Sequence, residues 1–390
     1  MKTKLYTPNV TLVLIASFFY MMSSMLITPI IAEFTQNIGA TSAIAGLIAG
    51  IMNITSLLLR PIAGNLTDRI SKYKLTMIGA SFLLLANLGY GLTTNLVIIT
   101  ALRIINGLGY TLCSVCMSTW IADLLPPNRV GAGMGIYGLA NALGMACGPA
   151  ISISLYKHVS HQSSFWLAAF CSLLLIIIIQ FVSNRGLPTK STKPTTKRHL
   201  QIVQPKVVPI AIILLLFSLP YFATQTYLVS YIAQRHFSVS AGIFFPIYAI
   251  ILLVLRLSMR DLFDRVPFKT FIKISLIGNL VGLLGLTHLT NWFFLIISTL
   301  GLAVGYGLMF SICQAKALMV VSPHEHGIAN STFYIGVDLG MSLGPITGGL
   351  ISNFLPISWF YPMMMITLPL IVIIYWMNRN LLAQKNSSNR

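Results

Sequence analysis

Apolar segments long enough to cross a lipid bilayer follow one another along almost the whole chain, with short polar stretches between them. A membrane-spanning helix needs about 20 residues, because each residue advances the helix by about 1.5 Å through roughly 30 Å of hydrocarbon. We therefore expect an all-α integral membrane protein with twelve transmembrane helices. The predicted spans are 10–32, 43–65, 73–94, 96–122, 130–155, 163–184, 207–233, 241–261, 268–289, 291–319, 326–352 and 357–379.

The charged residues support this interpretation. They make up 8% of the chain, whereas a soluble domain carries about 25%. The net charge of +18 would suit a nucleic-acid partner if it formed one patch, but nineteen Lys and Arg residues fall at the termini and in alternate loops, against two in the opposite loops. The positive-inside rule then predicts a multi-pass protein of the cell (inner or plasma) membrane with both termini cytoplasmic. The lipid bilayer is its expected surroundings, and nucleic acid is not an expected partner.

An internal repeat divides the chain into two halves of the same polarity. When the sequence is shifted by 196 residues, charged, Gly and Pro positions coincide, as where Asp68-Arg69 meets Asp264-Arg265 and Gly148-Pro149 meets Gly344-Pro345. Such repeats are common in secondary transporters. We expect two pseudo-symmetric six-helix bundles, residues 1–184 and 207–390. The basic segment 185–206, which has no acidic residue, is predicted to be a cytoplasmic linker.

Two sequence patterns carry the strongest signals. After the second predicted span comes a Gly-x-x-x-Asp-Arg-x-x-Lys stretch that joins it to the third. The fifth and eleventh spans carry glycines four residues apart followed by proline, a pattern that allows close helix contact and bends the helix. The positions of this packing pattern are Gly135, Gly144, Gly148, Pro149, Gly340, Gly344 and Pro345.

Together with the repeat, these motifs resemble the major facilitator superfamily, and within it the drug:proton antiporter branch of twelve-span multidrug exporters. The resemblance covers both halves. It implies a conformational latch at the cytoplasmic face that breaks as the protein changes access, with Asp68 offering its carboxylate to helix N-termini or basic side chains. The latch residues implied are Gly64, Asp68, Arg69, Lys72, Asp264 and Arg265.

Asp338 is the most informative single residue. It is the only acidic residue near the middle of a predicted span, and Asn330 and Tyr334 precede it at intervals of four on one helical face. A carboxylate at this depth can bind and release a proton, and ionisable residues inside membranes are functional by default. A structural hydrogen bond to a neighbouring helix is the alternative. The first span of such exporters usually carries an acid, and here Ser23 and Ser24 occupy that region.

Arg103, at the start of the fourth span, resembles the superfamily arginine associated with proton coupling, although it could instead reach the outer interface. Other polar residues of the spans expected to line a central cavity are as compatible with packing as with binding. The candidate residues for proton coupling or the substrate cavity are Asp338, Arg103, Tyr334, Asn330, Asn106, Tyr110 and Asn141, with Tyr20, Tyr137, Tyr221, Gln225, Tyr306 and Gln314 as further cavity candidates.

The leading hypothesis is a secondary active transporter that exports small amphipathic compounds by alternating access, with protons as the coupling ion. An uptake symporter or a flippase for a lipid-linked molecule is the alternative. A membrane-embedded enzyme would need clustered His, Cys or acidic residues, and the spans contain no such cluster. We therefore expect no enzyme activity, no catalytic residues, no cofactor and no metal. The protein is expected to act as a monomer.

Overall fold

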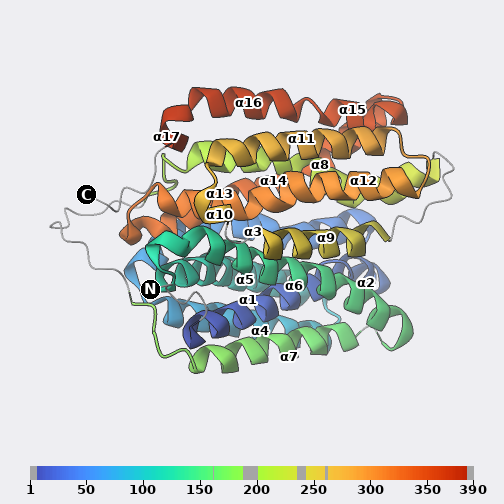
Figure 1. Cartoon of the computed structure of the whole chain (residues 1–390). Coiled ribbons are helices and arrows are strands. Elements are labelled where there is room, and N and C mark those ends of the chain that lie inside the picture. The colour runs from blue at the N-terminus through green and yellow to red at the C-terminus, as the bar shows by residue number, and fades with distance from the viewer. Residues whose placement is uncertain (1–6, 161, 188–200, 235–242, 260–261, 384–390) are drawn as a thin grey trace. The chain divides into compact units, whose positions relative to one another are not determined.

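The computed structural model describes residues 7–160, 162–187, 201–234, 243–259 and 262–383, and all regular structure in these ranges is helical (Figure 1). In them, eleven helices are long and apolar enough to cross a membrane, and Pro246–Ser258 is a shorter apolar helix. The predicted all-α membrane fold is therefore confirmed. The short helix lies where the span 241–261 was predicted, and residues 235–242 and 260–261 beside it lie outside the described part of the chain.

The helices follow the predicted order through both halves of the sequence. In the first half they are α1 (Pro8–Ile27), α2 (Ile31–Asn37), α3 (Ser42–Arg69), α4 (Lys72–Leu92), α5 (Leu96–Leu124), the 3₁₀ turn η1 (Pro127–Arg129), α6 (Val130–His158) and α7 (Ser163–Gln180). In the second half they are α8 (Val208–Gln234), α9 (Phe244–Ser258), α10 (Leu262–Arg265), α11 (Phe268–Thr287), α12 (Trp292–Leu302), the π-helical segment η3 (Ala303–Gly307), α13 (Leu308–Met319), the 3₁₀ turn η4 (Pro323–Glu325), α14 (His326–Phe354), the 3₁₀ turn η5 (Ile357–Trp359), α15 (Phe360–Met364), α16 (Thr367–Met377) and α17 (Arg379–Ala383).

Contacts group the chain into two compact units. Unit 1 comprises Met1–Pro126, Tyr137–Ile202 and Pro323–Ser331, and unit 2 comprises Pro127–Ile136, Val203–Ser322 and Thr332–Arg390. The first turns of α14 therefore belong to unit 1, although they lie in the second half of the sequence. The predicted division into 1–184, 185–206 and 207–390 follows the repeat and stays a prediction, and residues 188–200 of the predicted linker lie outside the described part.

The repeat extends to the way in which helices begin. Asn95 precedes α5, and its Oδ1 accepts hydrogen bonds from the N–H groups of Val97 (2.9 Å) and Ile98 (3.3 Å). The residue at the matching position of the second half is Asn291, whose Oδ1 accepts from Phe293 (3.0 Å) and Phe294 (3.3 Å) before α12. Each side chain satisfies two of the N–H groups that a helix start leaves without a partner.

A buried polar network crosses the core of unit 1. Asn87 of α4 donates to Ser23 of α1 (2.9 Å) and to Ser172 of α7 (3.0 Å), and the two hydroxyls lie 2.7 Å apart. Asn106 of α5 donates to the carbonyl of the same Asn87 side chain at 3.4 Å. Buried polar groups stabilise only when they are paired, so this network fixes how four apolar helices meet.

The structure extends the second predicted span, which was placed at 43–65. Helix α3 continues to Arg69 and α4 begins at Lys72, so Asp68 is helical as well as Gly64. The helix ends only at Ile70, which adopts an extended conformation with φ −118° and ψ 153°. Residues 66–69 stay helical beyond the predicted span, and the Ile70 N–H donates to the carbonyl of Leu66 at 2.8 Å.

The glycines of α6 and α14 lie where their helices approach others of the same unit. In unit 1, a Cβ added to Gly144 would lie 2.9 Å from Met21 Cβ, and one added to Gly148 would lie 2.7 Å from Met25 Cβ. In unit 2, a Cβ at Gly344 would lie 2.8 Å from Phe222 Cβ. These distances leave no room for a larger side chain.

We predict that Gly148→Ala destabilises the protein by about 1–3 kcal/mol, because the new methyl group would overlap the α1 backbone and Met25. Gly46→Ala is the matched control, since a Cβ there meets nothing within 4 Å. The measurement is the thermal unfolding midpoint of each purified variant in detergent. Equal midpoints for the two variants would contradict the close contact of α1 and α6.

Candidate functional site

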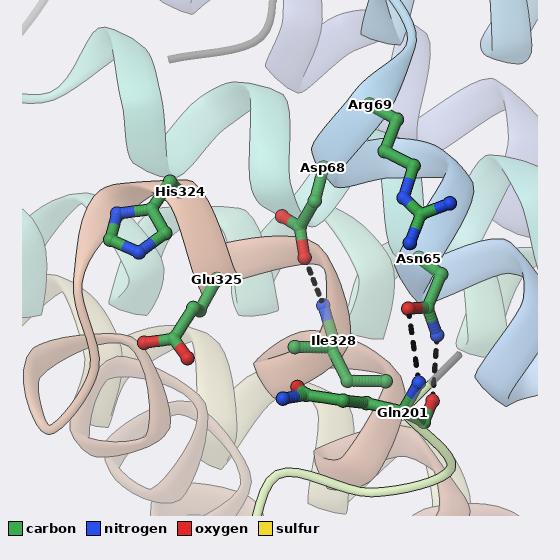
Figure 2. A pocket seen from close by; sticks show the side chains of 7 residues that line it. All are labelled: Asn65, Asp68, Arg69, Gln201, His324, Glu325 and Ile328. Atoms are coloured by element: carbon green, nitrogen blue, oxygen red, sulfur yellow. Dashed lines mark hydrogen bonds between the residues drawn. The ribbon is translucent and has the colours of Figure 1, made fainter. Parts of the chain in front are cut away.

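The carboxylate of Asp68, on the last turn of α3, binds the start of α14. Its Oδ1 accepts the N–H of Gly327 at 2.7 Å, and its Oδ2 accepts the N–H of Ile328 at 3.0 Å (Figure 2). These are two of the N–H groups that have no partner within α14, and the partial positive charge of the helix N-terminus favours the negative charge. Asp68 therefore acts as an N-terminal cap supplied by a different helix.

The backbones of α3 and α14 approach very closely beside this cap. A Cβ added to Gly64 would lie 2.9 Å from Ile328 Cα, and one added to Gly327 would overlap the carbonyl oxygen of Gly64. In addition, the hydroxyl of Ser331 donates to the carbonyl of Arg60. Glycine at both positions is what allows Asp68 to reach the α14 N–H groups.

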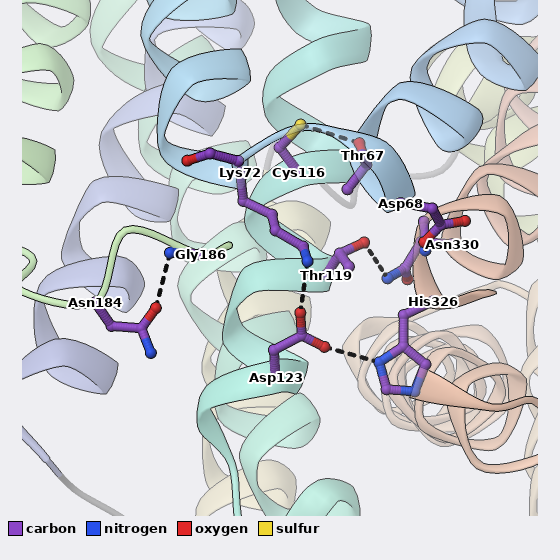
Figure 3. A network of polar contacts seen from close by, with 12 residues as sticks. Thr67, Asp68, Lys72, Cys116, Thr119, Asp123, Asn184, Gly186, His326 and Asn330 are labelled. Atoms are coloured by element: carbon purple, nitrogen blue, oxygen red, sulfur yellow. Dashed lines mark hydrogen bonds and ion pairs between the residues drawn. The ribbon is translucent and has the colours of Figure 1, made fainter. Parts of the chain in front are cut away.

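An ion-pair network lies next to the cap. Asp123, at the end of α5, accepts from Lys72 Nζ at 2.9 Å through Oδ2 and lies 2.9 Å from His326 Nδ1 through Oδ1 (Figure 3). Lys72 begins α4, and its side chain is only 2% exposed. One turn before Asp123, Thr119 Oγ1 accepts a hydrogen bond from Asn330 Nδ2 at 3.0 Å. We call Asp68, Lys72, Asp123, His326 and Asn330 the junction cluster.

Arg69 lies at the rim of a small pocket beside the junction cluster. Asn65, one turn earlier on α3, forms two hydrogen bonds with the backbone of Gln201: its Nδ2 donates to the carbonyl (2.6 Å), and its Oδ1 accepts from the N–H (3.3 Å) (Figure 2). The chain that leads into α8 is thus attached to α3. The pocket is lined by Asn65, Asp68, Arg69, Gln201, His324, Glu325 and Ile328.

The structure describes only part of the second copy of the motif. Asp264 and Arg265 lie on the short helix α10, and Arg265 is exposed. The Asp264 side chain, like Arg260 and Asp261, lies outside the described part of the structure. The role of Asp264 and Arg265 as a second latch therefore stays a prediction.

Arg103 is buried in unit 1, with 1% of its surface exposed. Its guanidinium donates to the carbonyls of Ala49 (2.9 Å) and Ile48 (3.3 Å) on α3, and lies 3.7 Å from Met52 Sδ. Backbone carbonyls thus surround the charge, which is one of the ways in which a membrane protein accommodates an arginine. In this state the side chain holds α5 to α3.

The other candidates of unit 1, Asn106, Tyr110 and Asn141, differ in their surroundings. Asn106 belongs to the Asn87 network, whereas Tyr110 lies beside Tyr20, with ring centroids 6.1 Å apart. Asn141 on α6 is 2% exposed, and neither its amide nitrogen nor its oxygen has a hydrogen-bond partner in the described structure. Of these side chains, Asn141 therefore has the most hydrogen-bonding capacity left for a ligand.

Asn330 and Tyr334, which are predicted to share one face of α14 with Asp338, have hydrogen-bond partners in different units. Asn330 is part of the junction cluster in unit 1, while Tyr334 accepts a hydrogen bond from Gln314 Nε2 at 3.2 Å in unit 2. Asp338 lies one turn further on and is 2% exposed. The structure thus brings Asn330 together with the latch residues rather than with Asp338.

Sequence reasoning missed the roles of Asp123 and His326. Asp123 directly follows the fourth predicted span, and His326 is the first residue of the eleventh, but the sequence singled out neither of them. The available signal was that both residues lie at span ends on the same predicted membrane side as Lys72, where the Asp123 carboxylate can pair with a basic side chain. No group of three or more His, Cys, Asp or Glu residues placed to hold a metal occurs in the described ranges.

Comparison with known proteins identifies relatives of the same architecture. A model described as "Major Facilitator Superfamily" matches residues 13–291 and 261–390. The staphylopine export protein of Staphylococcus aureus is 21% identical over 84% of this chain and 85% of that protein. The quinolone resistance protein NorA of S. aureus is 21% identical over 83% and 84%. The crystal structure of the human organic anion transporter MFSD10 superposes with a TM-score of 0.71 at 14% identity, covering 96% of this chain and 99% of that one.

We predict that Asp68→Asn destabilises the protein by about 1–2 kcal/mol. The asparagine side chain has one acceptor oxygen for the two α14 N–H groups and no charge at the helix N-terminus. Glu33→Gln, which neutralises an exposed acid on α2, is the control and should change stability little. The measurement is thermal unfolding of both purified variants. A midpoint for Asp68→Asn equal to that of Glu33→Gln would contradict the capping role.

Proposed function

The chain belongs to the Major Facilitator Superfamily, and on that premise we propose that it exports small amphipathic compounds in exchange for protons by alternating access. Two relatives support the export direction by name: one exports staphylopine, and the other confers quinolone resistance. The match with these relatives extends over more than four fifths of the chain, so it includes both sequence halves.

The observation that carries the proton-coupling proposal is the burial of Asp338. Among the five acidic side chains that the structure describes (Glu33, Asp68, Asp123, Glu325 and Asp338), only that of Asp338 is fully buried. It lies near the middle of the apolar span Pro323–Ser352. Coupling ions in secondary transporters bind near the bilayer midplane, where a carboxylate can alternate between charged and neutral forms.

The junction cluster supports the alternating-access part of the proposal. Its bonds are few, and each is formed by a side chain with backbone N–H groups or with another side chain at a helix end. An N-terminal cap contributes about 1 kcal/mol, so the Asp68 cap can break and re-form during a transport cycle. We propose that Asp68 releases Gly327 and Ile328 when the cytoplasmic side opens.

The orientation and oligomeric state are part of the same proposal. The excess of Lys and Arg at the termini and in alternate loops supports a cytoplasmic location for both ends of the chain. We propose that one chain is sufficient for transport, since both sequence halves needed for alternating access are present in it.

The direct test is transport in everted membrane vesicles with an imposed pH gradient and a panel of fluorescent amphipathic compounds. Export in exchange for protons predicts uptake into everted vesicles that are acidic inside, and its loss when the gradient is collapsed. Accumulation only in right-side-out vesicles would favour an uptake symporter. Movement of a lipid-linked reporter without dependence on the pH gradient would favour a flippase.

Asp338→Asn tests the proton site within the same assay. The variant removes the titratable group while nearly preserving its shape, so we predict that gradient-driven flux falls at least about tenfold while binding and passive exchange of substrate remain. Asp338→Glu should retain partial activity. Flux is measured against external pH for the three proteins, with Glu33→Gln as a control for the loss of an exposed acid. Normal gradient-driven flux in Asp338→Asn would rule out this site.

A further inference from the structure

A buried arginine of unit 2 has hydrogen-bonding capacity that the described structure does not use. Arg256 lies near the end of α9 with 3% of its surface exposed. Its Nη2 donates to the carbonyl of Gly307 at 2.8 Å, whereas Nε and Nη1 have no hydrogen-bond partner. A guanidinium has two pairs of parallel N–H groups, and a single bond from Nη2 leaves one of these pairs intact. That pair matches the two oxygens of a carboxylate.

The charge of Arg256 lies deep in the membrane region. Gly307, which it contacts, is near the middle of the apolar span Trp292–Met319. Helical side chains point toward the N-terminus of their own helix, so the guanidinium extends from the end of α9 back toward Tyr248, two turns earlier. A charge at this depth that lacks full pairing indicates a functional site, because its burial is costly.

Three tyrosine rings pack together, and two of them, Tyr248 and Tyr306, lie near enough to Arg256 to interact with it electrostatically. Tyr221 of α8 stacks on Tyr306 with ring centroids 4.6 Å apart and an interplanar angle of 22°, and it lies 4.9 Å from the ring of Tyr248. The phenol groups of Tyr248 and Tyr306 are the ionisable groups that interact electrostatically with the Arg256 guanidinium. We call Tyr221, Tyr248 and Tyr306 the tyrosine cluster. It offers flat aromatic faces next to a cation.

The backbone at this place departs from a regular helix. Residues Ala303–Gly307 form the π-helical segment η3 between α12 and α13, and this segment carries both Tyr306 and the carbonyl that Arg256 contacts. Single π-helical turns within longer helices occur frequently at functional sites. Interrupted membrane helices likewise line the substrate sites of many secondary transporters.

The sequence repeat provides an internal comparison. Arg60 occupies the matching position of the first half, and there its Nη1 donates to the hydroxyl of Ser114 while its guanidinium lies 5.5 Å from the centroid of the Tyr110 ring. The residue that matches Ser114 in the second half is Phe310, which has no hydrogen-bonding group. The protein therefore pairs this arginine internally in one half and leaves it available in the other.

We propose that Arg256 and the tyrosine cluster form a recognition site for the carboxylate of an aromatic organic anion. The remaining pair of guanidinium N–H groups binds the carboxylate, and the ligand ring stacks among the tyrosines. Because Tyr221, Tyr248 and Tyr306 are each at most 7% exposed, the ligand enters when these rings separate. The site deepens the transport proposal and rests on it, since it names the chemical class of the substrate.

The test is ligand binding to the purified full-length protein in lipid nanodiscs, measured by calorimetric titration. The probes are 2-naphthoate, its neutral amide 2-naphthamide and the cation 2-naphthylmethylammonium, which share one ring system. We expect the wild type to bind 2-naphthoate at least about tenfold more tightly than the other two probes. Arg256→Gln should abolish this preference while binding of 2-naphthamide persists, which also shows that the variant is folded.

Two further variants separate charge, geometry and stacking. Arg256→Lys keeps the charge but lacks the parallel N–H groups, so it should recover only part of the carboxylate preference. Tyr221→Leu should weaken the binding of 2-naphthoate and 2-naphthamide alike while leaving the preference intact. Arg60→Gln is the matched control and should preserve the preference.

A wild type that binds no probe, or binds all three equally, would overturn the proposal, as would Arg256→Gln with an unchanged preference. These outcomes are distinct from failure of the transport proposal. If vesicles export a compound in exchange for protons but no carboxylate preference exists, only the recognition site is wrong. If 2-naphthoate binds through Arg256 but no compound is moved in vesicles, the site stands and the transport proposal is wrong.

Discussion

The hydrogen bonds from Gly327 and Ile328 to the Asp68 carboxylate are the contact around which the rest of the junction cluster is arranged. They require an acid at the end of α3, a helix start opposite it, and glycine at both points of closest approach. The Lys72–Asp123–His326 network lies beside them and connects α4 and α5 to the same helix start. All of these contacts fall within unit 1, so the first turns of α14 are bound to α3 and α5 while the remainder of the helix belongs to unit 2.

The matching arginines of the two sequence halves differ in how fully they are hydrogen-bonded. In unit 1, Arg60, Arg103 and the Asn87 network find partners in hydroxyls, amides and backbone carbonyls. In unit 2, Arg256 keeps one intact pair of N–H groups near Tyr248 and Tyr306. Because an unpaired buried charge is costly, its retention is best explained by a ligand that completes the pairing during transport. At the position that matches Ser114, Phe310 provides no hydroxyl group for the arginine of the second half.

The spans, the repeat and the importance of Asp68 could be predicted from the sequence because they depend on local properties: hydropathy, spacing and charge. The partners of Asp68 could not, since no local pattern indicates that the Gly327 N–H lies opposite a residue 259 positions earlier. The extension of α3 from residue 65 to Arg69 was missed because hydropathy indicates where the apolar span ends, whereas the helix continues into the polar residues that follow it. The hydrogen bond of Asn330 to Thr119 could not be predicted either, and the role of Asn330 in a substrate cavity stays a prediction. The burial of Asp338 could be predicted from its place in the middle of an apolar span. Its role in proton coupling stays a prediction.

The central claim is that the Asp68 cap breaks and re-forms as transport proceeds. Hydrogen–deuterium exchange at the amides of Gly327 and Ile328 measures this directly, because both N–H groups are bonded to the carboxylate in the present state. We predict that exchange at these two amides accelerates at least about tenfold when a transported compound and a proton gradient are supplied in proteoliposomes, while amides in the middle of α14 stay protected. Equal protection of Gly327 and Ile328 with and without turnover would contradict the account.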